Sequence, residues 1–193
     1  MTNHRKTSPQ RLEPVKTVMG EQRLFFSLKF SLGQQQQLLP YQKHALAIST
    51  DARPTDEDNL HLTLFFLGQT NPTQQQQLLI GASQITVPAF TLTFDYLAYF
   101  ARPKILYLAP SVIPQPLLHL QHQLATLCKL AGFSDLHSQY RPHITLARNA
   151  NCLPGFYQSV SPIVMQIKQF ALYQSLQQQG RLRYLPLTLF ELD

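Results

Sequence analysis

Two four-residue segments of the sequence nearly repeat each other and carry groups suited to acid–base chemistry. Residues 61–64 read His-Leu-Thr-Leu and residues 143–146 read His-Ile-Thr-Leu. In an extended strand, residues two apart project from the same face, so each imidazole lies beside a threonine hydroxyl. Histidine can give or take a proton near neutral pH. Two such strands facing each other would place an acid and a base around a small anion, as metal-independent phosphoester chemistry requires.

These segments and their surroundings resemble the paired H-x-T-L motifs of the 2H phosphoesterases, and more narrowly the LigT-like RNA 2′,3′-cyclic phosphodiesterases. The similar stretches follow the family's order and cover roughly residues 23 to 190, with the best agreement in 23–28, 59–68, 141–148 and 170–175. One four-residue match would be weak evidence, because short patterns recur by chance. Two matches, each inside a longer similar stretch, are a strong signal.

The resemblance implies hydrolysis of RNA 2′,3′-cyclic phosphate ends to 2′-phosphates, with no cofactor and with RNA 3′ ends or small cyclic nucleotides as partners. Of His61 and His143, one would take the proton of the attacking water and the other would protonate the leaving ribose oxygen. The sequence leaves open which histidine has which role. It also leaves open a 2′-5′ RNA ligase, a phosphodiesterase for 2′,5′-oligoadenylates or small cyclic nucleotides, and a non-catalytic module that binds RNA ends.

Three further residues are candidates for binding the phosphate. Thr63 and Thr145 share a face with their histidines and can donate hydrogen bonds to non-bridging oxygens. The family carries an arginine at the place of Arg148, whose guanidinium can bind phosphate through two hydrogen bonds. In a straight strand Arg148 would face away from His143, so we expect it beyond the strand end, where the chain turns. Arg141 has the matching parity and is a weaker candidate.

Aromatic residues can stack on the terminal base of an RNA. The candidates are Phe100, Tyr107 and Tyr140. Relatives commonly have tryptophan where Tyr107 stands, whereas this chain has no tryptophan. This difference bears on base preference more than on the fold.

Composition narrows the class of protein. A hydrophobic fraction of 44% and a charged fraction of 13% are typical of a folded globular protein. No hydrophobic run approaches the roughly 20 residues that span a bilayer, and a net charge of +6 suits an anionic partner. Cys128 and Cys152 lack metal-binding spacing, and the histidines form no ligand cluster. We therefore expect a cytoplasmic monomer with reduced thiols, no metal site and no membrane association.

Strand and helix patterns alternate from residue 23 onward, after a polar segment, residues 1–22, that we interpret as a flexible extension. Strands are predicted at 24–30, 60–67, 90–94, 105–108, 143–147, 164–173 and 182–190, the last two paired around a turn at Gly180. Helices are predicted at 34–49, 73–83 and 116–131, with Pro40 near the start of the first or dividing it.

This order predicts a single α+β domain from residue 23 to 193, with a crude internal repeat. Its unit is a strand, a helix, a motif strand and a strand pair. The family resemblance further implies two pseudo-symmetric lobes, each an antiparallel sheet backed by helices. The active site would lie in the groove between them. Periodicity alone predicts the α+β class but not the arrangement of lobes.

Overall fold

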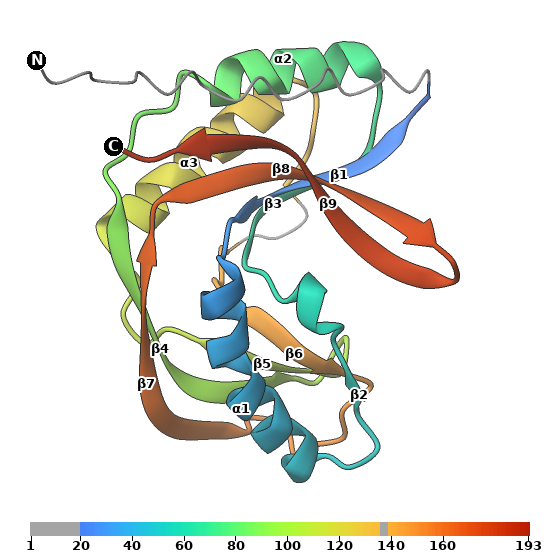
Figure 1. Ribbon diagram of the computed structural model, residues 1–193, viewed down its shortest axis with the longest axis vertical. Coiled ribbons are helices and arrows are strands. Elements are labelled where there is room, and N and C mark those ends of the chain that lie inside the picture. Colours follow the sequence, from blue (N-terminus) through green and yellow to red (C-terminus); the bar gives the residue numbers. More distant parts are fainter. Residues whose placement is uncertain (1–19, 136–138) are drawn as a thin grey trace, which may run out of the picture.

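The computed structural model describes residues 20–135 and 139–193, which form two antiparallel sheets backed by helices (Figure 1). The first sheet has the order β3 (Thr63–Thr70), β1 (Gln22–Leu28), β8 (Gln169–Gln178) and β9 (Arg181–Glu191). The second has the order β2 (Arg53–Pro54), β6 (Ile144–Arg148), β5 (Ile105–Ala109), β4 (Phe90–Phe100) and β7 (Tyr157–Ile167). The predicted α+β class with two helix-backed antiparallel sheets is confirmed.

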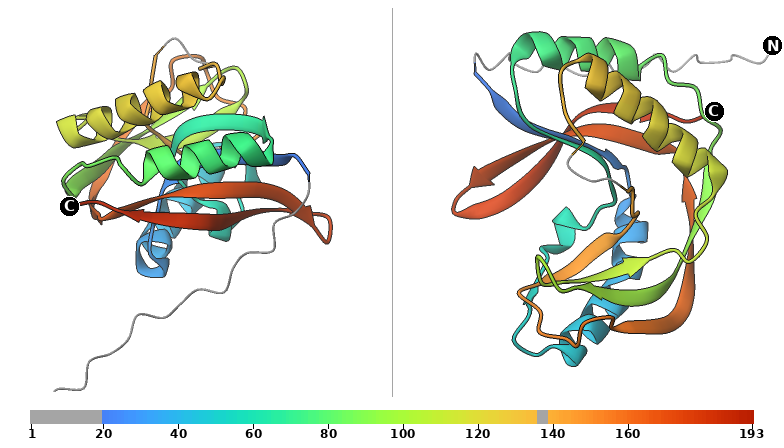
Figure 2. Two further views of the ribbon diagram at one scale, coloured as in Figure 1. Left: turned by 90° about the horizontal axis from the view of Figure 1, so that it is seen from above. Right: turned by 180° about the vertical axis from the view of Figure 1, so that it is seen from behind.

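Each sheet and its helices form one lobe, and the helices of the two lobes lie at opposite ends of the molecule (Figure 2). Helices α2 (Pro72–Ala82) and α3 (Gln115–Leu130) pack together over the first sheet, and α1 (Leu32–Ile48) packs against the second. A 3₁₀ turn, η1 (Glu57–Asn59), joins β2 to the first motif. Among the described residues, no helix combines the length and the hydrophobicity needed to cross a bilayer.

Helices α1 and α2 both begin with a capping box. In α1 the Ser31 hydroxyl accepts from the Gln34 backbone N–H at 3.2 Å, while the Gln34 side chain accepts from the Ser31 N–H at 2.9 Å. Helix α1 therefore starts two residues earlier than predicted. Pro40 lies within this helix without dividing it. It occupies the exposed face, where water can satisfy the carbonyl that loses its partner.

The predicted strand 164–173 is wrong, because the chain changes sheets within it. Residues up to Ile167 belong to β7 in the second sheet, and residues from Gln169 belong to β8 in the first. Both halves bury hydrophobic side chains, so periodicity gives no sign of the crossing. The β8–β9 hairpin is confirmed, with Gln179 (φ 50°) and Gly180 (φ 75°) in its turn.

The amino-terminal boundary also differs slightly from the prediction. Strand β1 begins at Gln22, which pairs with Thr70. The expected extension, residues 1–22, therefore includes the first strand residue. Residues 1–19 lie outside the described part of the chain.

Candidate active site

The two motif segments meet directly through an antiparallel bridge between Leu62 and Ile144. Both of these side chains are fully buried. Because neighbouring residues alternate faces, the histidine and threonine that flank each bridge residue point away from the core. The antiparallel register also sets the histidine of each motif across from the threonine of the other.

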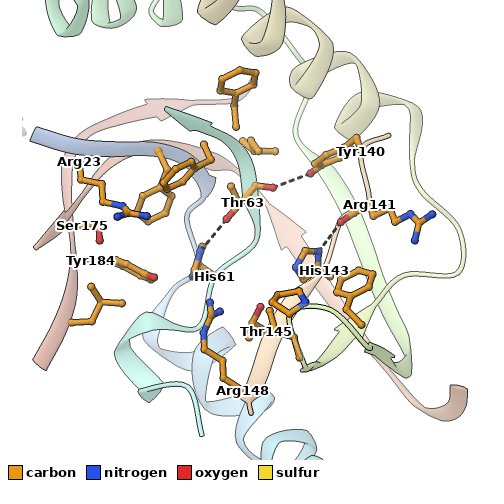
Figure 3. Close-up of a pocket in the computed structure, with 18 of the residues that line it drawn as sticks. Arg23, His61, Thr63, Tyr140, Arg141, His143, Thr145, Arg148, Ser175 and Tyr184 are labelled. Carbon is orange, nitrogen blue, oxygen red and sulfur yellow. Dashed lines mark hydrogen bonds between the residues drawn. The ribbon is translucent and has the colours of Figure 1, made fainter. Parts of the chain in front are cut away.

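The result is a crossed arrangement of four polar side chains, shown in Figure 3. His61 lies across from Thr145, and His143 lies across from Thr63. All four line one pocket of about 930 Å³ between the two sheets. The structure thus brings together the two histidines and two threonines that the motifs singled out.

Both motif strands carry a β-bulge at the same position. Residues 63 and 65 oppose consecutive residues of β1, and residues 145 and 147 oppose consecutive residues of β5. Leu64 and Leu146 are therefore the extra residues, and each reverses the alternation of faces along its strand. As a result, the third residue after each motif threonine returns to the pocket: Phe66 in one lobe and Arg148 in the other.

This bulge corrects our expectation for Arg148. The residue does not lie beyond the strand end, because it is the last residue of β6. The bulge at Leu146, rather than a turn, directs its side chain into the pocket toward His61 (Figure 3). The Leu146 carbonyl accepts hydrogen bonds from the Thr55 backbone N–H at 2.9 Å and from the buried Gln42 amide at 2.9 Å. These contacts hold the bulge against α1.

Backbone carbonyls fix the tautomer of both histidines. The Nδ1 of His61 lies 2.6 Å from the Asn59 carbonyl, and the Nδ1 of His143 lies 2.7 Å from the Arg141 carbonyl. A carbonyl can only accept, so each Nδ1 carries the hydrogen. Nε2 is then the nitrogen that exchanges protons in the pocket. In His61 this atom accepts from the Thr63 hydroxyl at 3.0 Å.

The environment of His61 disfavours its charged form. The His61 ring packs against Phe25 and Tyr184, with ring centroids at 5.2 and 4.9 Å, and these two aromatic rings also contact each other at 4.9 Å. Burial lowers the pKa of His61 to about 4, against the opposing effect of its backbone hydrogen bond, and the charges of His143 and Arg148 lower it further. His61 is therefore neutral at pH 7, with Nε2 able to accept a proton.

This pKa predicts that acid destabilises the fold through His61. The unfolded chain takes up a proton below about pH 6.5, whereas folded His61 resists it down to about pH 4. Stability should therefore fall as the pH drops through this window, by about 2–3 kcal/mol. Urea unfolding at pH 7 and at pH 4.5 should show a larger loss for the wild type than for His61→Gln. Equal losses in the two proteins would contradict the proposed environment of His61.

A polar brace holds the β8–β9 hairpin against His61. The buried Asn59 side chain donates to the Leu182 carbonyl at 2.8 Å and accepts from the Tyr184 backbone N–H at 3.2 Å. Arg183 forms an ion pair with Asp58 in the same turn at 3.0 Å. Sequence reasoning missed this role of Asn59, although the residue lies two positions before the motif histidine.

The aromatic candidates occupy three different settings. Phe100 and Tyr107 stack on each other at 4.1 Å, and the two rings contact His143 edgewise at 5.2 and 5.3 Å. The Tyr140 hydroxyl donates to the Thr63 backbone carbonyl at 3.3 Å. Burial raises the pKa of Tyr140. Tyr140 thus braces the segment before His143 against β3, and Phe100 and Tyr107 form a platform beside His143.

The pocket is strongly basic. Among the described residues that line it, four are arginines and one is acidic, Asp135; the arginines are Arg23, Arg102, Arg141 and Arg148. Such a surface favours a polyanion. In the described part of the chain, no group of three or more histidine, cysteine, aspartate or glutamate side chains is arranged to hold a metal ion.

Three strands contribute pocket residues that sequence reasoning missed. Arg23 on β1 lies with its guanidinium 5.1 Å from the centre of the Phe66 ring. Ser175 on β8 and Tyr184 on β9 line the same side of the pocket (Figure 3). Arg23 could have been found from strand parity, because it lies two residues before Phe25 on the face opposite Leu24. Ser175 had no comparable signal.

Comparison with known families bears directly on this site. Residues 44–177, which include both motifs, match the model of the 2′-5′ RNA ligase superfamily. The chain belongs to the 2′-5′ RNA ligase superfamily. The resemblance to 2H phosphoesterases of the LigT type is thereby confirmed.

Relatives in this superfamily are similar over most of the chain. An RNA 2′,3′-cyclic phosphodiesterase of Escherichia coli is 33% identical over 86% of this chain and 94% of its own length. One of Bacillus subtilis is 29% identical over 59% of this chain and 67% of its own length. The crystal structure of E. coli LigT complexed with 3′-AMP has a TM-score of 0.78 at 30% identity, covering 89% of this chain and 98% of that one.

Proposed function

We propose that this protein is an RNA 2′,3′-cyclic phosphodiesterase that works without a metal and releases a 2′-phosphate. The observation that carries the proposal is the crossed arrangement of two histidines and two threonines across the Leu62–Ile144 bridge. A binding module has no need of two proton-transfer groups with their tautomers fixed. The names of the E. coli and B. subtilis relatives agree with this reading.

We assign the general base to His61 and the general acid to His143. Neutral His61 takes a proton from the water that attacks phosphorus, and protonated His143 donates one to O3′ as the P–O3′ bond breaks. The product keeps its phosphate on O2′. With the substrate bound, the Thr63 hydroxyl turns from His61 Nε2 to donate to a non-bridging oxygen, which frees Nε2 to accept the proton of water. Thr145 also donates to a non-bridging oxygen, and Arg148 stabilises the charge that develops there. The low pKa of His61 supports its role as the proton acceptor.

The substrate class follows from the pocket. Its four arginines favour an RNA end over a neutral ligand, and the Phe100–Tyr107 stack offers a ring surface to the terminal base. We propose a monomer, because one chain supplies both histidines. We place it in the cytoplasm, where Cys128 and Cys152 would remain the free thiols that the structure shows.

The direct test uses a short RNA with a 2′,3′-cyclic phosphate end in excess EDTA. We expect full turnover, because the proposed acid, base and phosphate ligands are all side chains of the protein. Phosphorus NMR of the product should show a 2′-phosphate. An RNA with a free 5′-hydroxyl, added to the same reaction, reports ligation, in which the 5′-hydroxyl attacks phosphorus in place of water as the P–O3′ bond breaks.

Three outcomes would contradict the proposal. Loss of turnover in EDTA with recovery on adding a divalent ion would show that the mechanism needs a metal. Tight stoichiometric binding without hydrolysis would indicate an RNA-end binding module. A 3′-phosphate product would show that the other ribose oxygen leaves.

A further inference from the structure

Aromatic side chains continue beyond the pocket across the second sheet. By strand pairing, Thr145, Tyr107, Ala98 and Tyr157 form one row across β6, β5, β4 and β7. Neighbouring strands lie ~4.8 Å apart, so the backbone of Tyr157 lies about 14 Å from that of Thr145. A base stacked beside His143 does not reach that far.

Tyr157, the last residue of this row, belongs to a second pair of stacked rings. Tyr96 and Tyr157 stack with centroids 4.9 Å apart and planes at 29°. Tyr96 lies two residues before Ala98 on the same face of β4, whereas Leu97 faces the core and is fully buried. Ala98 separates this outer pair from the Phe100–Tyr107 stack. Tyr157 is 59% exposed, which leaves ring surface open to a ligand.

A carboxylate and an arginine lie near the outer pair. Burial raises the pKa of the Tyr96 and Tyr107 hydroxyls, and the Asp95 carboxylate raises that of Tyr96 further, whereas the charge of the pocket residue Arg141 lowers both. The nearby Asp95 carboxylate accepts hydrogen bonds from the Ser111 backbone N–H at 2.8 Å and from the Ser111 hydroxyl. Two hydrogen bonds thus hold the Asp95 carboxylate to Ser111, while Arg141 supplies positive charge near both tyrosines.

Within residues 20–135 and 139–193, the opposite side of the pocket offers no equal surface. There Phe25 is buried, at 3% exposed, and the Phe66 ring lies under the Arg23 guanidinium. Tyr184 packs edgewise against His61. The exposed stacked pair is therefore on the side of His143.

We propose that Tyr96 and Tyr157 form a second stacking subsite, which binds bases preceding the reacting 3′ end of a single-stranded RNA. This inference rests on the proposed function. A cyclic phosphate end is attached to the rest of its RNA only through the 5′ side of the terminal ribose, so the strand must leave the pocket. Aromatic faces bind successive bases of such strands with little sequence preference. The outer pair lies on the same face of the second sheet as the platform beside His143 and further from the pocket.

The first test compares substrates of increasing length with the wild-type protein. The substrates are adenosine 2′,3′-cyclic phosphate and oligoadenylates of two, three and four nucleotides ending in a 2′,3′-cyclic phosphate. We expect KM to fall as nucleotides are added and then to level off, with little change in kcat. A KM independent of length would overturn the inference and leave the proposed function intact. No hydrolysis of any substrate would instead contradict the proposed function.

The second test uses variants of the outer pair in the full chain. Tyr96→Ala and Tyr157→Ala should each raise KM for the tetranucleotide by about 5–100-fold. They should leave the kinetics of the mononucleotide unchanged. Tyr96→Phe and Tyr157→Phe keep the rings and should behave as the wild type. Val164→Ala removes an exposed side chain elsewhere on β7 and serves as the matched control.

Two results would contradict the subsite. An equal rise in KM for mononucleotide and tetranucleotide would indicate a general structural effect of the alanine variants. Unchanged KM values for the tetranucleotide would show that the outer pair does not contact the strand. If an alanine variant fails to fold, a KM independent of length in the wild type still refutes the subsite.

Discussion

Replacing His61 or His143 with alanine should lower kcat for a cyclic phosphate substrate by about 10²–10⁴ in each case. Each substitution removes one of the two proton transfers and leaves the water or the leaving oxygen without its partner. Both side chains face the pocket, next to bridge residues that remain in the core, so the fold should persist. Steady-state kinetics on adenosine 2′,3′-cyclic phosphate, with circular dichroism as a check on folding, provides the measurement. His122→Ala, on the exposed surface of α3, is the control.

The pH profile separates the two roles. In the wild type, the fall in kcat on the acid side of the pH profile should reflect protonation of the general base. This acid limb should lie near pH 4, because the pKa of His61 is about 4. The alkaline limb should report the acid. His61→Ala should lose the acid limb, and His143→Ala should lose the alkaline limb. The double variant should be far less impaired than the product of the single losses, since the two groups act in one transition state. A folded single variant with near-normal turnover would refute the two-histidine mechanism.

The part of the site that depends on the alternation of side chains within one strand could be predicted from the sequence. Spacing alone showed that His61 shares a face with Thr63 and that His143 shares one with Thr145. The bridge between the two motifs is a contact between residues far apart in the sequence, so no local pattern predicts it. The family resemblance supplied what periodicity could not, namely that the two motif strands face a common groove.

The two β-bulges could not be predicted, because the sequence analysis assumed straight strands with regular alternation of side chains. Leu146 reads as an ordinary hydrophobic strand residue, and nothing in its type predicts that it will be the extra one. Its carbonyl is satisfied by Gln42, which lies 104 residues earlier on α1. The location of Arg148 therefore depends on a distant helix. The same limit explains the single strand predicted for 164–173, where the chain passes between sheets without a glycine or a proline.

Arg148→Gln should lower kcat by about 10²–10³, the usual cost of removing one donor that stabilises developing negative charge. Arg148→Lys should recover part of this loss, because it keeps the charge but not the planar pair of donors. Rapid-quench single-turnover kinetics on the tetranucleotide measures the chemical step directly. Arg181→Gln, an exposed arginine at the start of β9, is the matched control and should leave kcat unchanged.

Arg148 also has an effect that a purely structural arginine would lack. Its charge is one of the causes that lower the pKa of His61, although burial is the larger one. Arg148→Gln should therefore raise the pKa of His61 and move the acid limb of the pH profile toward neutrality. Arg148→Lys should keep the limb near its original position. Loss of activity in Arg148→Gln without a shift of the acid limb of the pH profile would mean that the guanidinium does not lie near His61 in the working enzyme. The bulge at Leu146 would then have a structural role only.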